Sequence, residues 1–478
     1  MEKFGKVIVK LRIPILILSF LLLIPSAIGY FNTRVNYDIL YYLPNEIETM
    51  QGQDILMDDF NKGAYAMVVV QNMDTKSTDR LIKKVENVDH VAQVISYTGI
   101  VGEDVPSEIV PSKFRKYFEN DSTDTTLFAI FFDNTTSSDD TMNAIIQIRE
   151  QTEGQAFISG MSAVVTDTKN LSEKETPLYV LIAVVLVCIV LAIFMDSFLV
   201  PVFFMISIGM AIVYNLGSNI LLGEVSYITK ALAAVLQLGV TLDYSIFLWH
   251  SYKEMKEIYP DDHKEAMAVA IGNTLTSVVG SSITTVAGFI ALCFMSFTLG
   301  LDLGIVMTKG VVFGVICCVT VLPSMIMIFD NALEKTKHRQ LIPDFPKISD
   351  FVVKHHVIFA ILFVVLFIPF AYFQAHASVY YNLDASLPDT LPSVQANTKL
   401  SEEYDMGAAH MILLDKDLDA KQKYNMIADI EKVDGVKQVL GLESIIGPAF
   451  PESMIPEDVK EILESDNYEL MLIMNEYA

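Results

Sequence analysis

Seven long apolar runs constrain this 478-residue chain more than any other feature. A helix crosses the hydrocarbon core of a bilayer with roughly 17–25 apolar residues. Seven runs fall in or near this range, and we expect each of them to form a membrane-spanning helix. They are Ile13–Phe31, Leu178–Met195, Leu199–Leu222, Ile228–Trp249, Thr276–Phe297, Leu303–Phe329 and Val357–Phe373. The sequence therefore predicts a multi-pass protein of the cytoplasmic membrane.

Acidic side chains are concentrated in two segments between these runs. Residues 32–176 hold 12 basic and 24 acidic residues, and residues 376–478 hold 7 and 20. Together they account for the net charge of −25 of the whole chain. So acidic a chain argues against nucleic-acid binding. Solvated acidic segments suit the outer side of the membrane, away from the anionic lipid of the inner leaflet.

The direction of the spans follows from the basic residues beside them. Lys3, Lys6, Lys10 and Arg12 precede the first run, which places the N-terminus in the cytoplasm. The basic segment 330–356 agrees with this direction, so both acidic segments are expected outside. A basic start before an apolar run also occurs in cleaved signal peptides, but the length of this run and its recurrence later in the chain argue against one.

An internal repeat relates the start of the chain to its end. With a shift of 344 residues, a membrane helix and the segment after it overlie a second helix and segment. Six helices separate the two starts, so both copies run in the same direction, as in parallel-repeat transporters. The matches include Lys10 with Lys354, Ile24-Pro25 with Ile368-Pro369, Tyr37 with Tyr381, Leu43-Pro44 with Leu387-Pro388, Gly63 with Gly407 and Met67 with Met411.

The first acidic segment has the pattern of an α+β domain. Two successive strand–helix–strand units are typical of a ferredoxin-like fold. The second segment repeats only the first unit and one further strand, Tyr468–Met474. We therefore expect a truncated form of a product ~200 residues longer, with about five more spans. The predicted elements of the first segment are strands 64–71, 92–97, 127–133 and 156–159 and helices 78–88 and 142–151.

These observations predict six parts along the chain. Residues 1–31 form a first membrane helix, 32–176 an external α+β domain, 177–330 a five-helix membrane cluster, 331–356 a cytoplasmic linker, 357–375 a seventh membrane helix, and 376–478 an incomplete second external domain.

Asp243 is the ionisable residue of greatest interest within these runs. It lies about 22 Å below the outer end of the fourth run, at 1.5 Å per residue. A charge near the bilayer centre costs at least ~2.5–3.5 kcal/mol, so such residues usually face the bundle interior and serve a function. A carboxylate that loads and releases a proton at this depth is a coupling site. A structural carboxyl bonded to neighbouring hydroxyls is the alternative.

The fifth run carries small and hydroxyl residues at the same depth. Such residues allow helices to approach closely and to form hydrogen bonds with each other. A role in packing alone remains an alternative for them. Lys309 is expected to extend toward the outer surface, since its depth differs from that of Asp243 by roughly 12 Å. The candidates are Ser281, Ser282, Thr284 and Thr285 as supporting hydroxyls, Gly239 and Gly280 as packing positions, Tyr244 as a hydrogen-bond partner and Phe247 as a hydrophobic gate.

Motifs of enzymes and of cofactor sites are not found in the sequence. The chain has no phosphate-binding glycine loop and no nucleophile elbow, so we expect neither ATP coupling nor catalysis. Its histidines lack metal-ligand spacing. The four cysteines lie in apolar runs, where they act as small hydrophobic residues. No cofactor, no metal and no disulfide are expected.

The segment Leu238–Leu248 resembles the G-x-x-x-D-Y-x-x-F pattern of the RND superfamily, in its MMPL-like, hydrophobe/amphiphile exporter branch. The order of one helix, a large loop and a five-helix cluster is also similar, as is Leu322-Pro323 near the end of the sixth run. The resemblance implies proton-driven export of lipids or hydrophobic compounds through external porter domains. It implies that Asp243 and Tyr244 form the proton relay and that Phe247 is a gate, with the proton gradient as the energy source.

One departure from this family concerns the partners of the chain. The family has a second Asp-Tyr pair in the equivalent helix of the second half, and this sequence ends before it. We therefore expect the missing half or a partner chain, with a homo-oligomer as another possibility, besides the membrane and a lipid or hydrophobic small-molecule substrate. The alternatives left open are a SecDF-like accessory of protein export, a non-transporting sensor or scaffold, and an inactive fragment.

Overall fold

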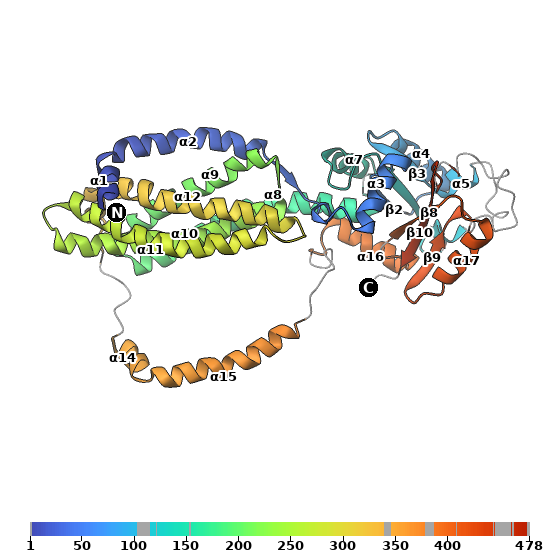
Figure 1. The fold of residues 1–478 in the computed structure, drawn as a ribbon. Coiled ribbons are helices and arrows are strands. Elements are labelled where there is room, and N and C mark those ends of the chain that lie inside the picture. Colours follow the sequence, from blue (N-terminus) through green and yellow to red (C-terminus); the bar gives the residue numbers. More distant parts are fainter. Residues whose placement is uncertain are drawn as a thin grey trace. The chain divides into compact units, whose positions relative to one another are not determined.

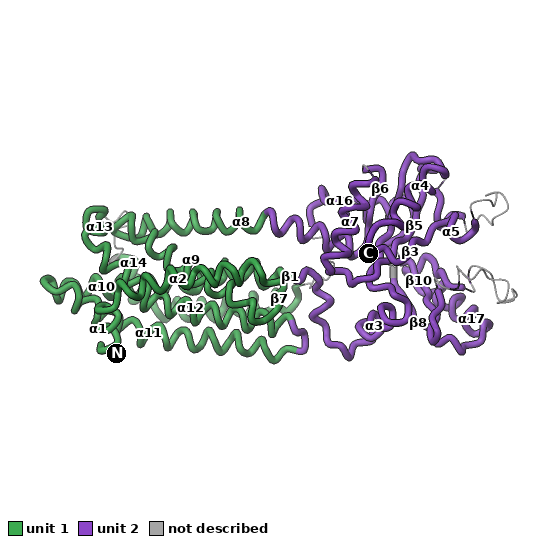
Figure 2. Tube along the Cα trace, turned by 90° about the horizontal axis from the view of Figure 1, so that it is seen from above, with its two compact units in different colours: residues 1–35, 175–295, 299–383 green, residues 36–174, 296–298, 384–478 purple. Residues whose placement is uncertain are grey.

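A computed structural model describes residues 2–102, 115–120, 122–152, 154–338, 346–377, 387–407, 409–442, 444, 460 and 463–475. Its contacts divide the chain into two units (Figure 2). The helical unit comprises residues 1–35, 175–295 and 299–383. The α+β unit comprises residues 36–174, 296–298 and 384–478.

Seven helices are long and apolar enough to cross a membrane, which confirms the predicted number of spans. Their ends differ from the apolar runs because polar turns prolong several helices. The side chain of Asp262 accepts hydrogen bonds from the Lys264 and Glu265 amides, so α11 begins well before the apolar run. The seven are α2 (Arg12–Asn32), α8 (Met161–Phe194), α9 with the short η2 (Leu199–Leu222), α10 (Tyr227–Ile258), α11 (His263–Leu292), α12 (Leu299–Ile328) and α15 (His356–Ala375).

Helices α2, α9, α10, α11 and α12 pack around one hydrophobic core (Figure 1). Shorter elements complete the helical unit: α1 (Glu2–Lys10), α13 (Asp330–Lys335), α14 (Pro346–Lys354) and the paired strands β1 (Arg34–Asn36) and β7 (Glu224–Ser226).

The crossing of α2 and α9 depends on small residues. A β-carbon at Gly217 would lie 2.1 Å from the carbonyl oxygen of Ser26, and one at Gly29 would lie 2.1 Å from that of Gly217. The obstructing atoms are backbone, so they cannot rotate away. The Tyr214 hydroxyl fixes the same pair of helices by donating to the Ser19 carbonyl at 2.6 Å.

Replacing Gly217 with Val should force α2 away from α9 and destabilise the helical unit. Overpacking typically costs 1–3 kcal/mol, and a clash with backbone lies at the upper end. Gly209 of the same helix offers a matched control, since a β-carbon there meets no atom within 4 Å. Thermal unfolding in detergent should show a lower midpoint for Gly217→Val only; equal midpoints for both variants would contradict this packing.

Helix α15 differs from α2, its counterpart in the repeat. None of its side chains is buried within the described residues. Phe363, Phe370 and Phe373 stand where the first copy has Ser19, Ser26 and Gly29. Apart from contacts with α14, such as that of Phe359 with Phe351, the described residues thus leave the aliphatic and aromatic side chains of α15 uncovered.

The α+β unit contains two antiparallel sheets. The larger has the strand order β3-β5-β2-β6, with β4 beside β5. Helices α4 and α7 bury their apolar faces against one side of this sheet. The elements are β2 (Ala64–Gln71), α4 (Thr75–Glu86), β3 (Val91–Ile95), α5 (Tyr97–Val101), β4 (Glu119–Asn120), β5 (Thr125–Phe132), α7 (Asp139–Gln151) and β6 (Ala156–Ser159), preceded by η1 (Leu40–Tyr42) and α3 (Glu48–Phe60). The predicted α+β pattern is confirmed.

The second sheet repeats part of the first. Its strand order is β8-β10-β9, with β8 (Ala409–Asp415), β9 (Val436–Leu440) and β10 (Tyr468–Asn475). Helices α16 (Pro392–Tyr404) and α17 (Ala420–Ile430) correspond to α3 and α4. The residues that end α3 and α16, Asn61 and Asp405, both adopt left-handed backbone, with φ of 53° and 52°. The internal repeat is therefore structural as well as sequential.

Candidate functional site

Asp243 lies on a face of α10 that no other part of the described chain covers. Gly239, Asp243 and Phe247 follow at intervals of four residues, so they share this face. All three are exposed, and Phe247 retains 56% of its accessible surface. A β-carbon at Gly239 would meet no atom within 4 Å. Within the described residues the Asp243 carboxylate has neither a hydrogen bond nor a salt bridge.

Tyr244 points the other way, into the helical core. Neighbouring residues on a helix are about 100° apart. Tyr244 is 3% exposed and belongs to the main core cluster of the helical unit. The structure therefore separates the two members of the proposed relay onto different faces of α10.

Three of the candidate hydroxyls of α11 are bonded to their own helix rather than to Asp243. Ser282 is buried and donates to the Val278 carbonyl at 2.6 Å. The Thr284 and Thr285 hydroxyls both donate to the Ser281 carbonyl, at 2.7 and 3.2 Å. Gly280, Ser281 and Thr284 are exposed, so this stripe of α11 is open as well.

A second polar group, not predicted from the sequence, lies inside the helical unit. The Asn215 amide donates to Gln237 Oε1 at 3.1 Å, and the Gln237 amide donates to the Gly310 carbonyl at 3.0 Å. Lys309 donates to Asn219 Oδ1 at 2.6 Å and to the Ser218 hydroxyl at 3.1 Å, so its amine extends toward η2 and not toward Asp243. In the sequence, this polar group could have been indicated only by the amides of Asn215 and Gln237 within otherwise apolar runs.

At one end of the helical unit, His263, Asp330 and Glu334 lie close enough to hold a metal ion. Lys256, however, already fills the space between the carboxylates, at 3.4 Å from Asp330 and 2.8 Å from Glu334. His263 Nδ1 is 2.6 Å from the other oxygen of Asp330. The group therefore works as an ion-pair cluster that joins α10, α11 and α13.

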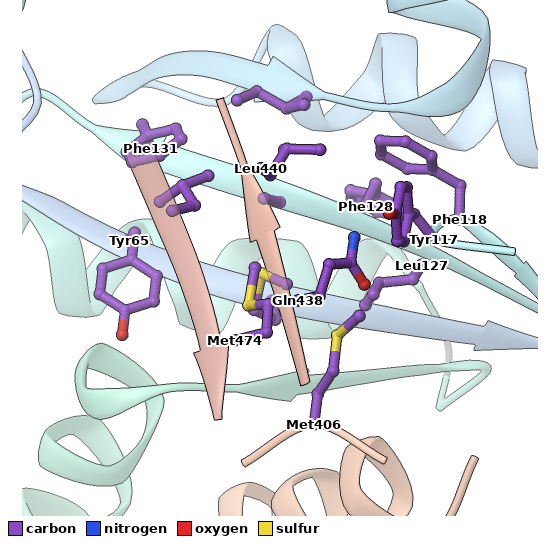
Figure 3. A pocket seen from close by; sticks show the side chains of 14 residues that line it. Tyr65, Tyr117, Phe118, Leu127, Phe128, Phe131, Met406, Gln438, Leu440 and Met474 are labelled. Carbon is purple, nitrogen blue, oxygen red and sulfur yellow. The ribbon is translucent and has the colours of Figure 1, made fainter. Parts of the chain in front are cut away.

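The α+β unit contains an apolar pocket between its two sheets (Figure 3). Met67 from β2, Met406 before β8 and Met474 from β10 surround it together with aromatic residues, and Gln438 supplies an amide. The cavity has a volume of about 40 Å³, which is too small for a lipid chain. Methionine side chains are flexible and repack readily, so the walls of this pocket are suited to opening around an apolar ligand.

Lys62 lies beside the wall of this pocket. Its amine is 5.5 Å from the centre of the Phe131 ring, and its side chain is almost fully buried. Burial lowers the pKa of Lys62 from its ordinary value of 10.5 to about 8, because the charged form loses its hydration.

The Lys62→Met variant should be more stable at neutral pH, and its advantage should disappear at high pH. Between pH 8 and 10.5 the unfolded chain binds the proton that the folded chain releases, so wild-type stability rises with pH in this window. The gain at pH 7 should be about 2–3 kcal/mol at most. Methionine occupies the equivalent position 406 in the repeat. Unfolding of the whole chain at several pH values measures the effect; Lys432→Met, at an exposed lysine, is the control. A difference that does not change with pH would contradict it.

Comparison with known proteins shows the family of this chain. The pattern of the MMPL family matches residues 42–359, and the chain belongs to this family, whose members are membrane transporters rather than enzymes. It is a multi-pass membrane protein of the MMPL/RND type.

Similar proteins include membrane protein MJ1562 of Methanocaldococcus jannaschii, which is 23% identical over 66% of this chain and 90% of that protein. ActII-3 of Streptomyces coelicolor is 35% identical over 26% of this chain, a match that spans 18% of that protein. Among solved structures, SecDF matches 68% of this chain and 39% of its own at 15% identity and a TM-score of 0.34.

Proposed function

We propose that this chain forms one half of a proton-coupled exporter of lipids or other hydrophobic compounds in the cytoplasmic membrane. In this proposal its N-terminus is cytoplasmic and the α+β unit is outside. The uncovered carboxylate of Asp243, in the middle of a helix long enough to span the bilayer, is the observation that supports it most directly.

An ionisable side chain in the middle of a membrane helix is rarely left facing lipid. A charge there costs several kcal/mol, and such residues face protein or a water-filled cavity. The face of Gly239, Asp243 and Phe247 and the small-residue stripe of α11 are both open. Small residues on spanning helices favour close packing with another helix. We therefore infer that a second helical bundle covers Asp243 in the working assembly.

In that assembly Asp243 would alternate between a protonated and an ionised state. The neutral carboxyl tolerates an apolar surface, whereas the carboxylate requires water or a hydrogen-bond donor. The exposed Thr284 hydroxyl, which donates to the Ser281 carbonyl, and the exposed Ser281 hydroxyl are able to turn toward the carboxylate. Proton binding would thus favour one packing of the two bundles and proton release another. Tyr244 would act through the core and not by direct contact.

The proposed substrate class rests on the apolar pocket of the α+β unit. Its walls are methionine, aromatic and aliphatic side chains, with one amide. Such a lining favours an apolar chain over a charged or strongly hydrated solute. No ATP and no metal are needed in this scheme, since the proton gradient supplies the energy.

The test is transport by the assembly isolated from its native membrane and reconstituted in liposomes. An imposed pH gradient should drive the movement of a fluorescent lipid or a hydrophobic dye, and a protonophore should stop it. Movement that is unaffected by the gradient would refute proton coupling. Crosslinking of the α+β unit to emerging polypeptide, without movement of lipid or dye, would instead support a role in protein export.

A further inference from the structure

The turns that lead into β2 and β8 have the same backbone geometry in the two copies of the repeat. In each turn a residue in the left-handed conformation is followed by one further residue and then by a glycine whose amide donates to the neighbouring strand. The left-handed residues are Asn61 and Asp405; Gly63 donates to the Phe132 carbonyl at 2.8 Å and Gly407 to that of Asn475 at 2.7 Å. The residues between them, Lys62 and Met406, therefore occupy equivalent places.

These two equivalent side chains lie at different sides of the apolar pocket between the sheets. Figure 3 shows Met406 at one side of the pocket and Phe131 at the other. Lys62 belongs to the Phe131 side, with its amine 5.5 Å from the centre of that ring and 5.3 Å from the centre of the Phe60 ring. One side of the pocket thus carries a methionine, whereas the other has a positive charge beside its wall.

The charge of Lys62 is costly for the fold. Only 5% of this residue is exposed, so its ammonium group loses most of its hydration. The methionine at position 406 shows that the same turn accepts an apolar side chain. Natural proteins retain residues that lower stability chiefly where function requires them. The burial of a lysine at this wall therefore indicates a ligand that needs its charge.

One anionic group and one apolar chain would suit these surroundings. A carboxylate would restore the interactions that the buried ammonium loses, through a charge-assisted hydrogen bond. Aromatic ring faces also favour a cation close by, which keeps the amine at the wall. The cavity of about 40 Å³ has to widen for a chain, and the methionines that line it allow this because their side chains repack readily. A narrow pocket of this kind favours a single chain over the two chains of a phospholipid.

We propose that the pocket binds a long-chain fatty acid, with its carboxylate at Lys62 and its hydrocarbon chain directed toward Met406. The proposal rests on the proposed function, since it gives the hydrophobic substrate of the exporter an anionic headgroup. An ester with the same chain presents no charge to Lys62 and should bind more weakly. The pocket would then select among hydrophobic compounds by their headgroup as well as by their chain.

Photolabelling of the whole chain in phosphatidylcholine nanodiscs tests this assignment at neutral pH. The probes are palmitic acid with a diazirine in its chain and the methyl ester of the same molecule, and mass spectrometry measures labelling of Met67, Met406 and Met474. Each probe partitions into the lipid in the same way for every variant, so the ratio of acid to ester labelling reports the preference of the protein. Lys62→Met should lower this ratio by roughly tenfold or more, because a buried charge-assisted hydrogen bond is lost. Labelling by the ester should persist in this variant, which shows that the pocket is still folded.

Two comparisons make the result specific. Lys432→Met removes an exposed lysine of the same unit and should leave the ratio unchanged. Phosphatidic acid with the same photoreactive chain should label the pocket less than the fatty acid does. A ratio that Lys62→Met leaves unchanged, equal or stronger labelling by the phosphatidic acid, or no pocket labelling by either palmitate probe would overturn the proposal. Labelling needs no proton gradient, so gradient-driven transport can fail while this proposal holds, and transport of other hydrophobic compounds can proceed if it fails.

Discussion

The Asp243→Asn variant of the assembled transporter should lose all pH-gradient-driven export. Asparagine has nearly the size and polarity of a protonated aspartic acid, so the packing of the open face of α10 is kept. It cannot release a proton, and the alternation between two states of the face would stop. Export should fall to the level of protein-free liposomes, while movement down a substrate gradient is reduced less.

Glu254→Gln is the matched control for this experiment. Glu254 lies on the same helix, beyond its apolar part, and is exposed. Its substitution makes the same chemical change without touching the Asp243 face, so export should be unaffected. Gradient-driven export by Asp243→Asn at the wild-type rate would exclude Asp243 as the coupling residue.

Loss of Asp167 should produce the largest defect in the α+β unit. Its carboxylate accepts hydrogen bonds from both terminal nitrogens of Arg149, at 2.5 and 3.0 Å, and from the Ser393 amide at 2.8 Å. The side chain of Asp167 is 4% exposed and that of Arg149 is 20% exposed. Removing one partner of such a pair leaves an uncompensated charge and costs about 3–5 kcal/mol. Asp167→Ala should therefore loosen α16 from the first sheet.

The measurement is hydrogen exchange at the first turns of α16 in the whole chain, since a local opening there is what the variant should promote. Asp429→Ala removes one partner of an exposed pair with Lys432, whose side chains are 76% and 73% exposed, and should change exchange little. If Asp167→Ala left the α16 amides as protected as Asp429→Ala does, the ion pair would have no part in holding the two repeats together.

Much of the fold could be predicted because it depends on local patterns. The strands Ala64–Gln71 and Ala156–Ser159 were predicted to the residue. Continuous apolar runs bounded by polar turns specify buried strands at short length and membrane helices at long length. The repeat could be found because both copies keep their prolines, glycines and helix ends.

The candidate site was less predictable, because its geometry depends on which face of α10 is covered. Polar residues lie on both faces of this helix: Gln237 and Thr241 inside, Asp243 outside. Periodicity alone does not distinguish a core face from one reserved for a partner. The Asp167–Arg149 pair joins residues on two helices of the tertiary structure, and nothing in their spacing marks it.

The three phenylalanines of α15 make the two helices of the repeat unequal in their packing surfaces. Where a single methyl group at Gly29 would already collide with the backbone of Gly217, α15 presents a benzyl group at Phe373. Helix α15 therefore cannot take the place of α2 against the α9 of any neighbouring copy. Helix α15 needs a wider groove than the one that α2 occupies on α9, so two identical chains cannot pair by exchanging these helices.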